Sequence, residues 1–335
     1  MMKKVILFFL GLFTLWGCSS QLQVKLSGDS PPGSIYLYPR HEQSAQVPDR
    51  VDIEELPRGS KTQMENGIAV IFGIEEYKYT FEASYKRRDA TTFSNYCRDV
   101  LGIPDERIAL RLDSFATKAE FDFVFEPRGT NRKGWLKQRL QDRRAAAQTD
   151  LFIYLAGHGF PDLSTENLYF IPYDRRPNQA ADGIALKKLF RTLSDFGARR
   201  VMVFIESSFS GVSGYDRSGV QKPLVQDMNP IFPAIQYSMI GPSTVVFTAT
   251  SGKQSSNNRA DLGYGIFTYF ALKGLGGEAD GDGDSAITVE ELFRYVNREV
   301  PRKALEQPLE INQVPNLLPP VGQLGERAQW VLVQY

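Results

Sequence analysis

The chain has 335 residues, of which 42% are hydrophobic and 12% aromatic, so it can bury a sizeable core in one large domain or two small ones. Lys and Arg together number 39, as do Asp and Glu, and the formal net charge is zero. This balance produces no long-range field of the kind that attracts nucleic acid, and we expect no nucleic-acid partner.

Residues 1–17 have the pattern of a bacterial lipoprotein signal peptide. Two lysines precede an apolar run, Val5–Leu15, which is too short to span a bilayer as a helix. The run leads into a segment that resembles the lipobox, in which Cys18 would be acylated. This resemblance implies a lipid-anchored protein of the bacterial cell envelope with its domain facing the periplasm or the exterior, and Ser19 favours the outer membrane. Ordinary signal cleavage and an uncleaved anchor are the alternatives.

Three further parts follow in the expected organisation of the chain. Residues 18–66 contain many Pro, Gly and polar residues and are predicted to form a tether, with a short strand at Ser34–Leu37. Residues 67–300 alternate apolar runs with helical patterns, which predicts an α/β domain. Residues 301–335 are rich in Pro, end in an apolar run typical of a strand, and are expected to pack on the domain.

Strand and helix patterns alternate through the domain in the order that a parallel sheet covered on both faces requires. The expected strands span residues 67–74, 108–112, 150–158, 168–171, 200–208 and 243–249. The expected helices span residues 89–101, 132–147, 185–196, 265–273 and 289–300. The connections between parallel strands should be right-handed crossovers.

Two of these strands end in residues that could form one site. The run Asp150–Gly159 ends in His158 between two glycines, and the run Arg200–Gly211 ends in a serine-rich turn that contains Ser208. Ligands of open α/β sheets bind in crevices at the carboxyl ends of the strands. We therefore expect His158 and Ser208 to lie together in such a crevice.

The two motifs, Gly-His-Gly after one strand and a second strand closing on an acidic residue and Ser208, resemble those of the caspase-like cysteine peptidases. That family includes caspases, metacaspases and bacterial relatives, and it places its histidine about 50 residues before its cysteine. Phe247–Ser256 and Gly263–Leu275 look like late segments of bacterial members. The resemblance implies a caspase-like three-layer sandwich, and an oxyanion site made by backbone N–H groups near the nucleophile and Gly159.

Ser208 stands where this family has its nucleophilic cysteine. A thiol is partly ionised at neutral pH, whereas a hydroxyl needs a base that a third group orients. The resemblance implies no obligatory carboxylate partner for His158, so we expect a degenerate peptidase that retains a peptide-binding cleft. The alternatives are an active hydrolase using Ser208 with His158, an engineered or structural serine, and an envelope scaffold that binds through its outer surface. Cys97 lies in a helical pattern and is expected to be a core residue rather than a relocated nucleophile.

Asp89 and Glu206 match positions that are acidic in metacaspases, where they bind a basic side chain. Because carboxylates pair with Arg and Lys, the resemblance implies a peptide or protein partner with basic residues. Asp89 could instead be a helix N-cap, and Glu206 could be a buried hydrogen-bonded residue. Arg87 and Arg88 beside Asp89 could also neutralise the pocket.

Residues 280–291 fit the twelve-residue calcium loop except at its sixth position, where Ser285 replaces the usual glycine. Six of its positions could supply ligands through a side chain or a carbonyl: Asp280, Asp282, Asp284, Ala286, Thr288 and Glu291. The alternative is a turn followed by a helix with a capping box between Thr288 and Glu291. No cofactor is required by the expected chemistry, and a calcium ion here would be structural.

Overall fold

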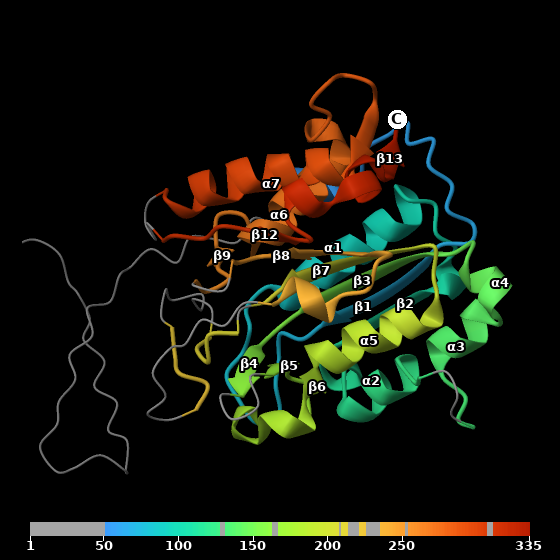
Figure 1. Ribbon diagram of the computed structural model, residues 1–335. Helices are drawn as coiled ribbons and strands as arrows, with labels where there is room; N and C mark the ends of the chain where they lie inside the picture. The colour runs from blue at the N-terminus through green and yellow to red at the C-terminus, as the bar shows by residue number, and fades with distance from the viewer. Residues whose placement is uncertain are drawn as a thin grey trace, which may run out of the picture. The chain divides into compact units, whose positions relative to one another are not determined.

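The computed structural model describes residues 51–127, 131–162, 167–207, 209–213, 221–225, 235–251, 254–306 and 311–335, all within one compact unit (Figure 1). Cys18, the expected strand Ser34–Leu37 and Ser208 lie outside these residues. In the ranges given above, no helix has the length and the apolar composition that crossing a bilayer requires.

A six-stranded sheet forms the centre of this unit, with strand order β12-β8-β7-β3-β1-β2. Its strands are β1 (Ile68–Gly73), β2 (Ile108–Leu112), β3 (Asp150–Ala156), β7 (Arg200–Glu206), β8 (Thr244–Thr248) and β12 (Asn316–Leu318). Neighbouring strands pair in parallel, except that β12 runs antiparallel to β8. The five parallel strands confirm the strands expected from their apolar runs, which are continuous because the sheet is covered on both faces.

Helices cover both faces of the sheet, as the three-layer sandwich requires (Figure 1). On one face lie α1 (Lys86–Asp99), α6 (Ile266–Lys273) and α7 (Val289–Ala304). On the other lie α2 (Lys118–Val124), α3 (Trp135–Leu140), α4 (Arg143–Ala146) and α5 (Leu186–Phe196). Alternate side chains of β1 enter the two cores, since Ala69 and Ile71 belong to one hydrophobic cluster and Val70 and Phe72 to the other. The protein is therefore an α/β protein in which one mostly parallel sheet lies between two layers of helices, as the expected three-layer sandwich requires.

The single helix expected at residues 132–147 is wrong, because α3 and α4 are separate. Gln141 has φ +46°, which no α-helix allows, and it ends α3. Asp142 then caps α4, its carboxylate accepting hydrogen bonds from the N–H groups of Arg144 and Ala145. A strong N-cap inside an amphipathic pattern thus starts a second helix.

Shorter elements connect these layers. The small strands are β4 (Gly159–Asp162), β5 (Asn167–Phe170), β6 (Ile184–Ala185), β9 (Asn258–Arg259), β10 (Tyr264–Gly265), β11 (Ala286–Thr288) and β13 (Val331–Gln334). The short helical turns are η1 (Asp52–Glu54), η2 (Asp105–Arg107), η3 (Asp113–Phe115), η4 (Pro177–Asp182), η5 (Tyr237–Met239), η6 (Gly274–Glu278), η7 (Val321–Gln323) and η8 (Gly325–Gln329). Strands β4, β5 and β6 form one antiparallel sheet beyond the end of β3.

Both ends of the described chain are tied to the domain. Of the expected tether, η1 buries Ile53 in the core, and the carboxylate of Glu54 accepts hydrogen bonds from Arg88 and Tyr264. At the other end, β12 forms an edge of the central sheet, and β13 pairs antiparallel with β11. The C-terminal strand β13 therefore packs against the segment that is expected to bind calcium.

Candidate functional site

The register of the central sheet aligns the strand ends that carry the two site motifs. In the parallel pair of β3 and β7, Ala156 lies opposite Glu206. His158 and Ser208 each follow two residues later in the chain. Because neighbouring parallel strands end at one edge of the sheet, this register is what a shared site would need. Ser208 itself is not among the described residues, so its proximity to His158 stays a prediction.

Gly157 and Tyr77 hold the backbone at the end of β3. The tyrosine hydroxyl accepts a hydrogen bond of 2.7 Å from the N–H of His158, and its ring centroid lies 4.8 Å from that of the imidazole. Gly157 has φ +155°, and a Cβ there would collide with the Tyr77 hydroxyl. Burial also raises the pKa of Tyr77 far above its usual range. The glycine before His158 is therefore required by close packing, and Tyr77 acts as a neutral support.

The imidazole of His158 is buried, with only 4% of the residue exposed. Its Nε2 lies 2.9 Å from the carbonyl oxygen of Phe81 and donates a hydrogen bond to it. Burial lowers the pKa of His158 to about 4, although the hydrogen bond to Phe81 works in the opposite direction. At neutral pH the ring is therefore uncharged and a weak base.

The connection between β1 and α1 covers this ring. Its Phe81 carbonyl caps the imidazole, while the side chains of Tyr79 and Phe81 face outward, 39% and 45% exposed. Cations lie over these aromatic rings: Arg176 and Lys78 are 4.3 Å and 5.1 Å from the centroid of Tyr79, and Lys222 is 5.2 Å from that of Phe81. Beneath this cover, a cavity of about 20 Å³ remains beside His158, room for about one water molecule.

The two acidic residues expected in the specificity pocket are close together and fully buried. Asp89 lies in the first turn of α1, and Glu206 ends β7. The ammonium of Lys86 lies 3.0 Å from Asp89 Oδ2 and 3.8 Å from Glu206 Oε1. The N-cap alternative for Asp89 is wrong, because the N-cap of α1 is Tyr85. The alternative for Glu206 is confirmed, because this residue is buried and its carboxylate accepts hydrogen bonds.

The charges of this cluster depend on one another. Burial opposes the charge on Lys86, but Asp89 and Glu206 outweigh it and raise the pKa of the lysine. Burial also raises the pKa of Asp89, against the ammonium that lowers it. One buried cation between two carboxylates balances only one of them, so a proton is retained on the cluster more readily than on isolated carboxyl groups.

Other expected site residues have simpler surroundings. Gly159 opens β4 and pairs with Phe170, and its expected role at an oxyanion stays a prediction. Cys97 is 1% exposed, and burial raises the pKa of its thiol well above the ordinary value. It is a core residue, as expected, because a buried neutral thiol is a poor nucleophile.

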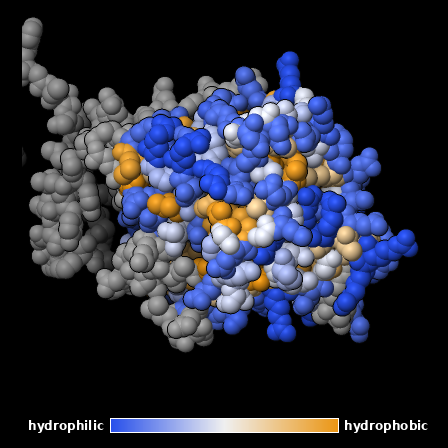
Figure 2. Space-filling view, turned by 45° about the horizontal axis from the view of Figure 1, so that its top comes forward, coloured by the Kyte–Doolittle hydropathy of each residue, from blue (hydrophilic) through white to orange (hydrophobic). Residues whose placement is uncertain are grey.

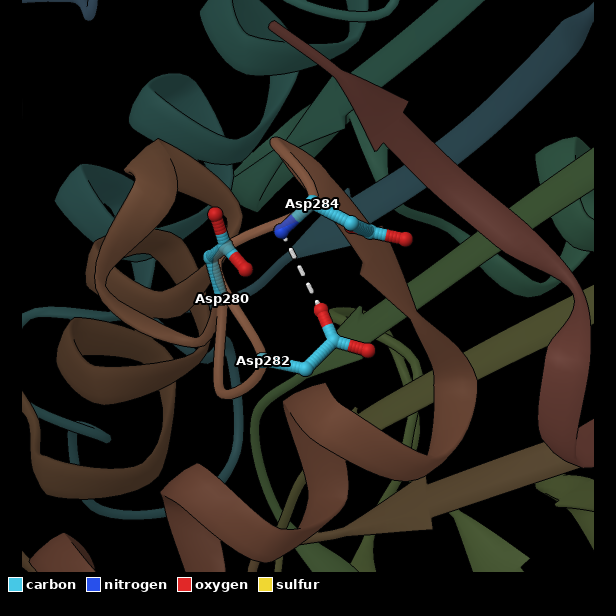
Figure 3. Close-up of side chains that lie close together, drawn as sticks. All are labelled: Asp280, Asp282 and Asp284. Carbon is cyan, nitrogen blue, oxygen red and sulfur yellow. Dashed lines mark hydrogen bonds between the residues drawn. The ribbon is translucent and has the colours of Figure 1, made fainter.

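The acidic loop before α7 brings three carboxylates together (Figure 3). One oxygen atom each of Asp280, Asp282 and Asp284 lies within 4.8 Å of the others. Ser285, at the position where a glycine was expected, has φ +67° and so adopts the conformation that glycine usually supplies. The oxygen donor set suits a hard cation such as calcium. The loop thus has the ligand type and the turn that the sequence predicted, and calcium binding stays a prediction.

Glu291 has a capping role in the same loop. One oxygen of its carboxylate accepts hydrogen bonds from the N–H and the hydroxyl of Thr288, and the other accepts one from the N–H of Gly281. The Thr288 hydroxyl in turn accepts one from the N–H of Glu291. The capping box is therefore present. To coordinate a cation through both of its oxygens, the Glu291 carboxylate would have to lose some of these hydrogen bonds.

Sequence reasoning missed Lys86, the residue that most changes the chemistry of the site. It also missed the polar groups that complete the cluster, namely Ser256, Asn258 and Thr268. The only local signal for Lys86 was its spacing of three residues before Asp89, which puts both on one face of a helix. Nothing local indicates the others, which are brought in by the fold.

The chain is similar to a known protein family and to solved structures. The model of the caspase domain family matches residues 66–319. Caspase-1 from Spodoptera frugiperda is similar in structure, with 14% sequence identity, a TM-score of 0.48, and coverage of 76% of this chain and 87% of the caspase. The protein GSU0716 from Geobacter sulfurreducens has 14% identity and a TM-score of 0.44, covering 75% and 92% of the two chains. No curated protein matches the sequence.

Proposed function

Because the chain belongs to the caspase domain family, we propose that it is a degenerate peptidase whose cleft binds a peptide or protein segment without cutting it. The observation that carries this proposal is the state of His158. Its imidazole is buried and neutral, and a backbone carbonyl, that of Phe81, accepts its hydrogen bond.

Serine hydrolases need a stronger arrangement than this one. Their histidine takes the proton of the serine hydroxyl while a carboxylate orients the ring and stabilises its positive charge. Here burial and the nearby ammonium of Lys86 both lower the pKa of His158, so protonating the ring is unfavourable. A hydroxyl at position 208 would therefore attack a peptide carbonyl far more slowly than a thiolate does.

The test is a comparison of peptide cleavage by the wild type with cleavage by Ser208→Ala and His158→Ala. We expect no turnover above the level of the two variants on mixed peptide libraries, and no labelling of Ser208 by a serine-directed phosphonate. Turnover that both substitutions abolish would instead establish the active hydrolase that uses Ser208 with His158.

The outer edge of the cover over His158 offers contacts for a bound segment. Tyr79 and Phe81 are half-exposed aromatic residues, of the type enriched where proteins bind other proteins. A photoreactive amino acid at position 79 or 81 should therefore crosslink to the ligand in cell extracts. The matched control is the same amino acid in place of Arg294, which is exposed on α7.

The same crosslinks distinguish the scaffold alternative, in which the outer surface binds the partner. Figure 2 shows one face of the protein, where hydrophobic residues form separate small patches among hydrophilic ones. This face gives no observation in favour of a broad apolar interface. Crosslinks from position 294 with none from 79 or 81 would support the scaffold and count against a cleft ligand.

Anchoring through Cys18 is part of the proposal and rests on the lipobox pattern at the end of the apolar segment. Acylation would place the domain at the bacterial envelope, with the outer membrane favoured. The variant Cys18→Ser should move the protein from the membrane fraction to the soluble fraction and stop its labelling by a fatty-acid analogue. Membrane retention by Cys18→Ser without labelling would indicate an uncleaved apolar anchor instead.

A further inference from the structure

Lys86 is a buried cation that lies beside two carboxylates and one side-chain amide oxygen. It is the first residue of α1 and is 4% exposed. Its ammonium donates hydrogen bonds to Asp89 at 3.0 Å and to the side-chain oxygen of Asn258 at 2.6 Å, and it lies 3.8 Å from Glu206. Of its three donor hydrogens, two are used in these hydrogen bonds, and the carboxylate of Glu206 is near enough for an ion pair.

The carboxylates around this ammonium are already supplied with donors. Glu206 Oε1 accepts from the Ser256 hydroxyl at 2.5 Å, and Oε2 accepts from the N–H and the hydroxyl of Thr268, both at 2.8 Å. Asp89 Oδ1 accepts from the N–H of Gly265 at 3.0 Å. A second cation entering this pocket would therefore have to displace bonds that exist already.

The pocket also lacks space for a ligand side chain. Lys86, His158, Ser256 and Asn258 line the cavity of about 20 Å³ beside the imidazole, which holds about one water molecule. A Cβ at Gly265 would lie 2.5 Å from Glu206 Oε2 and 2.8 Å from Lys86 Nζ. The packing is so close that only glycine fits on this wall of the pocket.

We propose that the side chain of Lys86 fills the acidic pocket formed by Asp89 and Glu206. Lys86 is then a specificity-determining residue, because its ammonium takes the place of a ligand's basic side chain. The wild-type pocket consequently does not accept Arg or Lys, and a segment bound in the cleft makes its contacts elsewhere. This role of Lys86 rests on the proposed function, because it concerns the same cleft. Its test needs neither a peptide nor turnover, so the role of Lys86 and the proposed peptide binding can each fail without the other.

The test is chemical rescue of the variant Lys86→Ala. This substitution removes three carbons and the ammonium, and n-propylammonium has the same atoms. The variant should melt roughly 10 °C below the wild type, because it leaves a buried acidic pair without its cation. At about ten times its dissociation constant, n-propylammonium should raise the melting temperature of the variant by roughly 4 °C and leave the wild type unchanged.

Two controls separate pocket binding from a general effect of amines. Trimethylammonium has the same composition and charge but only one N–H donor and a branched shape, so it should not rescue the variant. Lys303→Ala removes a lysine that is ion-paired with Asp261 and Glu306 on the surface, and n-propylammonium should not restore it. A folded Lys86→Ala that n-propylammonium fails to stabilise, or a wild type that it stabilises equally, would overturn the proposal.

A measurement on the wild type keeps the proposal testable even if Lys86→Ala does not fold. Acetic anhydride should modify Lys86 more slowly than the exposed Lys187 and Lys188, by about two orders of magnitude or more. The reason is that the protein must first open locally before the buried amine meets solvent. Mass spectrometry of the modified protein gives the three rates. Equal rates would show that Lys86 leaves the pocket readily and would contradict its role as a fixed occupant.

Discussion

Two groups of carboxylates in this protein have opposite surroundings. Beneath His158, Asp89 and Glu206 are fully buried, and the ammonium of Lys86 lies beside both. In the loop before α7, Asp282 and Asp284 are exposed, and no ion pair with either is present in the part of the chain that the structure describes. The backbone N–H groups of the loop itself donate to these carboxylates.

The difference follows from the cost of removing charge from water. A buried carboxylate without a partner is unfavourable by several kcal/mol, so the fold must supply a cation or a proton. Exposed carboxylates are stabilised by water, and they are left available for a cation from solution. The buried cluster is therefore complete in the folded chain, whereas the exposed cluster is one that an added ion could complete.

The largest effect should come from removing the buried cation. Lys86→Met should lower the free energy of unfolding by about 3–5 kcal/mol, because it leaves a buried charge uncompensated. Denaturant unfolding of the variant and of the wild type measures this difference. Lys118→Met is the control, since Lys118 pairs with Asp122 at the surface and should contribute about 1 kcal/mol or less.

A further variant locates the cause of that loss. Adding Asp89→Asn and Glu206→Gln to Lys86→Met removes the charges that the lysine balanced, and it should recover part of the lost stability. If the triple variant is less stable than Lys86→Met alone, the hydrogen bonds of the two carboxylates outweigh their charge, and the buried cluster does not depend on its cation.

The next effect is the pH dependence of the region around His158. Its pKa is lowered from 6.5 to about 4 in the folded protein, so the unfolded chain binds a proton more readily between these values. The stability that the neutral imidazole contributes is complete above pH 6.5 and is lost as the pH falls to about 4. The full loss is about 3 kcal/mol for a shift of this size.

The measurement compares the unfolding free energy of the wild type and of His158→Gln from pH 7.5 to pH 4. The glutamine amide can donate to the Phe81 carbonyl but does not titrate. The stability difference between the two proteins should therefore shrink or reverse toward pH 4. Parallel pH profiles would show that this imidazole keeps an ordinary pKa and would weaken the argument that it is a poor base.

The exposed cluster should respond to calcium with a smaller change. At roughly 30 times its dissociation constant, calcium should stabilise the folded protein by about 2 kcal/mol. Asp280→Asn combined with Asp282→Asn should abolish the effect, and a chelator should reverse it in the wild type. Glu290→Gln is the control, because it removes a neighbouring charge at a position that supplies no ligand. Calorimetry without binding heat, together with an unchanged melting temperature, would refute the calcium site.

The smallest effect concerns the turn within the same loop. Ser285 has φ +67°, a conformation that costs a residue with a Cβ about 1 kcal/mol or more, so Ser285→Gly should stabilise the protein by about 0.5–1 kcal/mol. Ser194→Gly in the exposed part of α5 should instead destabilise it by about 0.5 kcal/mol. Thermal unfolding of both variants checks the difference in sign, and equal losses would argue against strain at Ser285.

Much of the fold was predictable because burial leaves a local pattern. The five parallel strands of the sheet and the helices α1, α5, α6 and α7 follow from apolar runs and helical periodicity. The break between α3 and α4 was missed, since the apolar pattern continues across Gln141 and only Asp142 signals a new start. Strand β12 was missed as well, because three residues in a Pro-rich segment carry no periodicity and need β8 as a partner.

The amino-acid sequence by itself determined the order of the elements, the family resemblance, and the two strand ends at which His158 and residue 208 follow. These features depend on neighbours within one element, so a linear pattern records them. Only the tertiary structure decided that the acidic pocket already contains Lys86, that Phe81 caps the imidazole, and that β13 braces the acidic loop. Lys86 and Asn258, for example, are separated by 172 positions, and packing alone joins them. The charge balance of a buried site depends on such distant contacts, because its cost is determined by everything that replaces water around it.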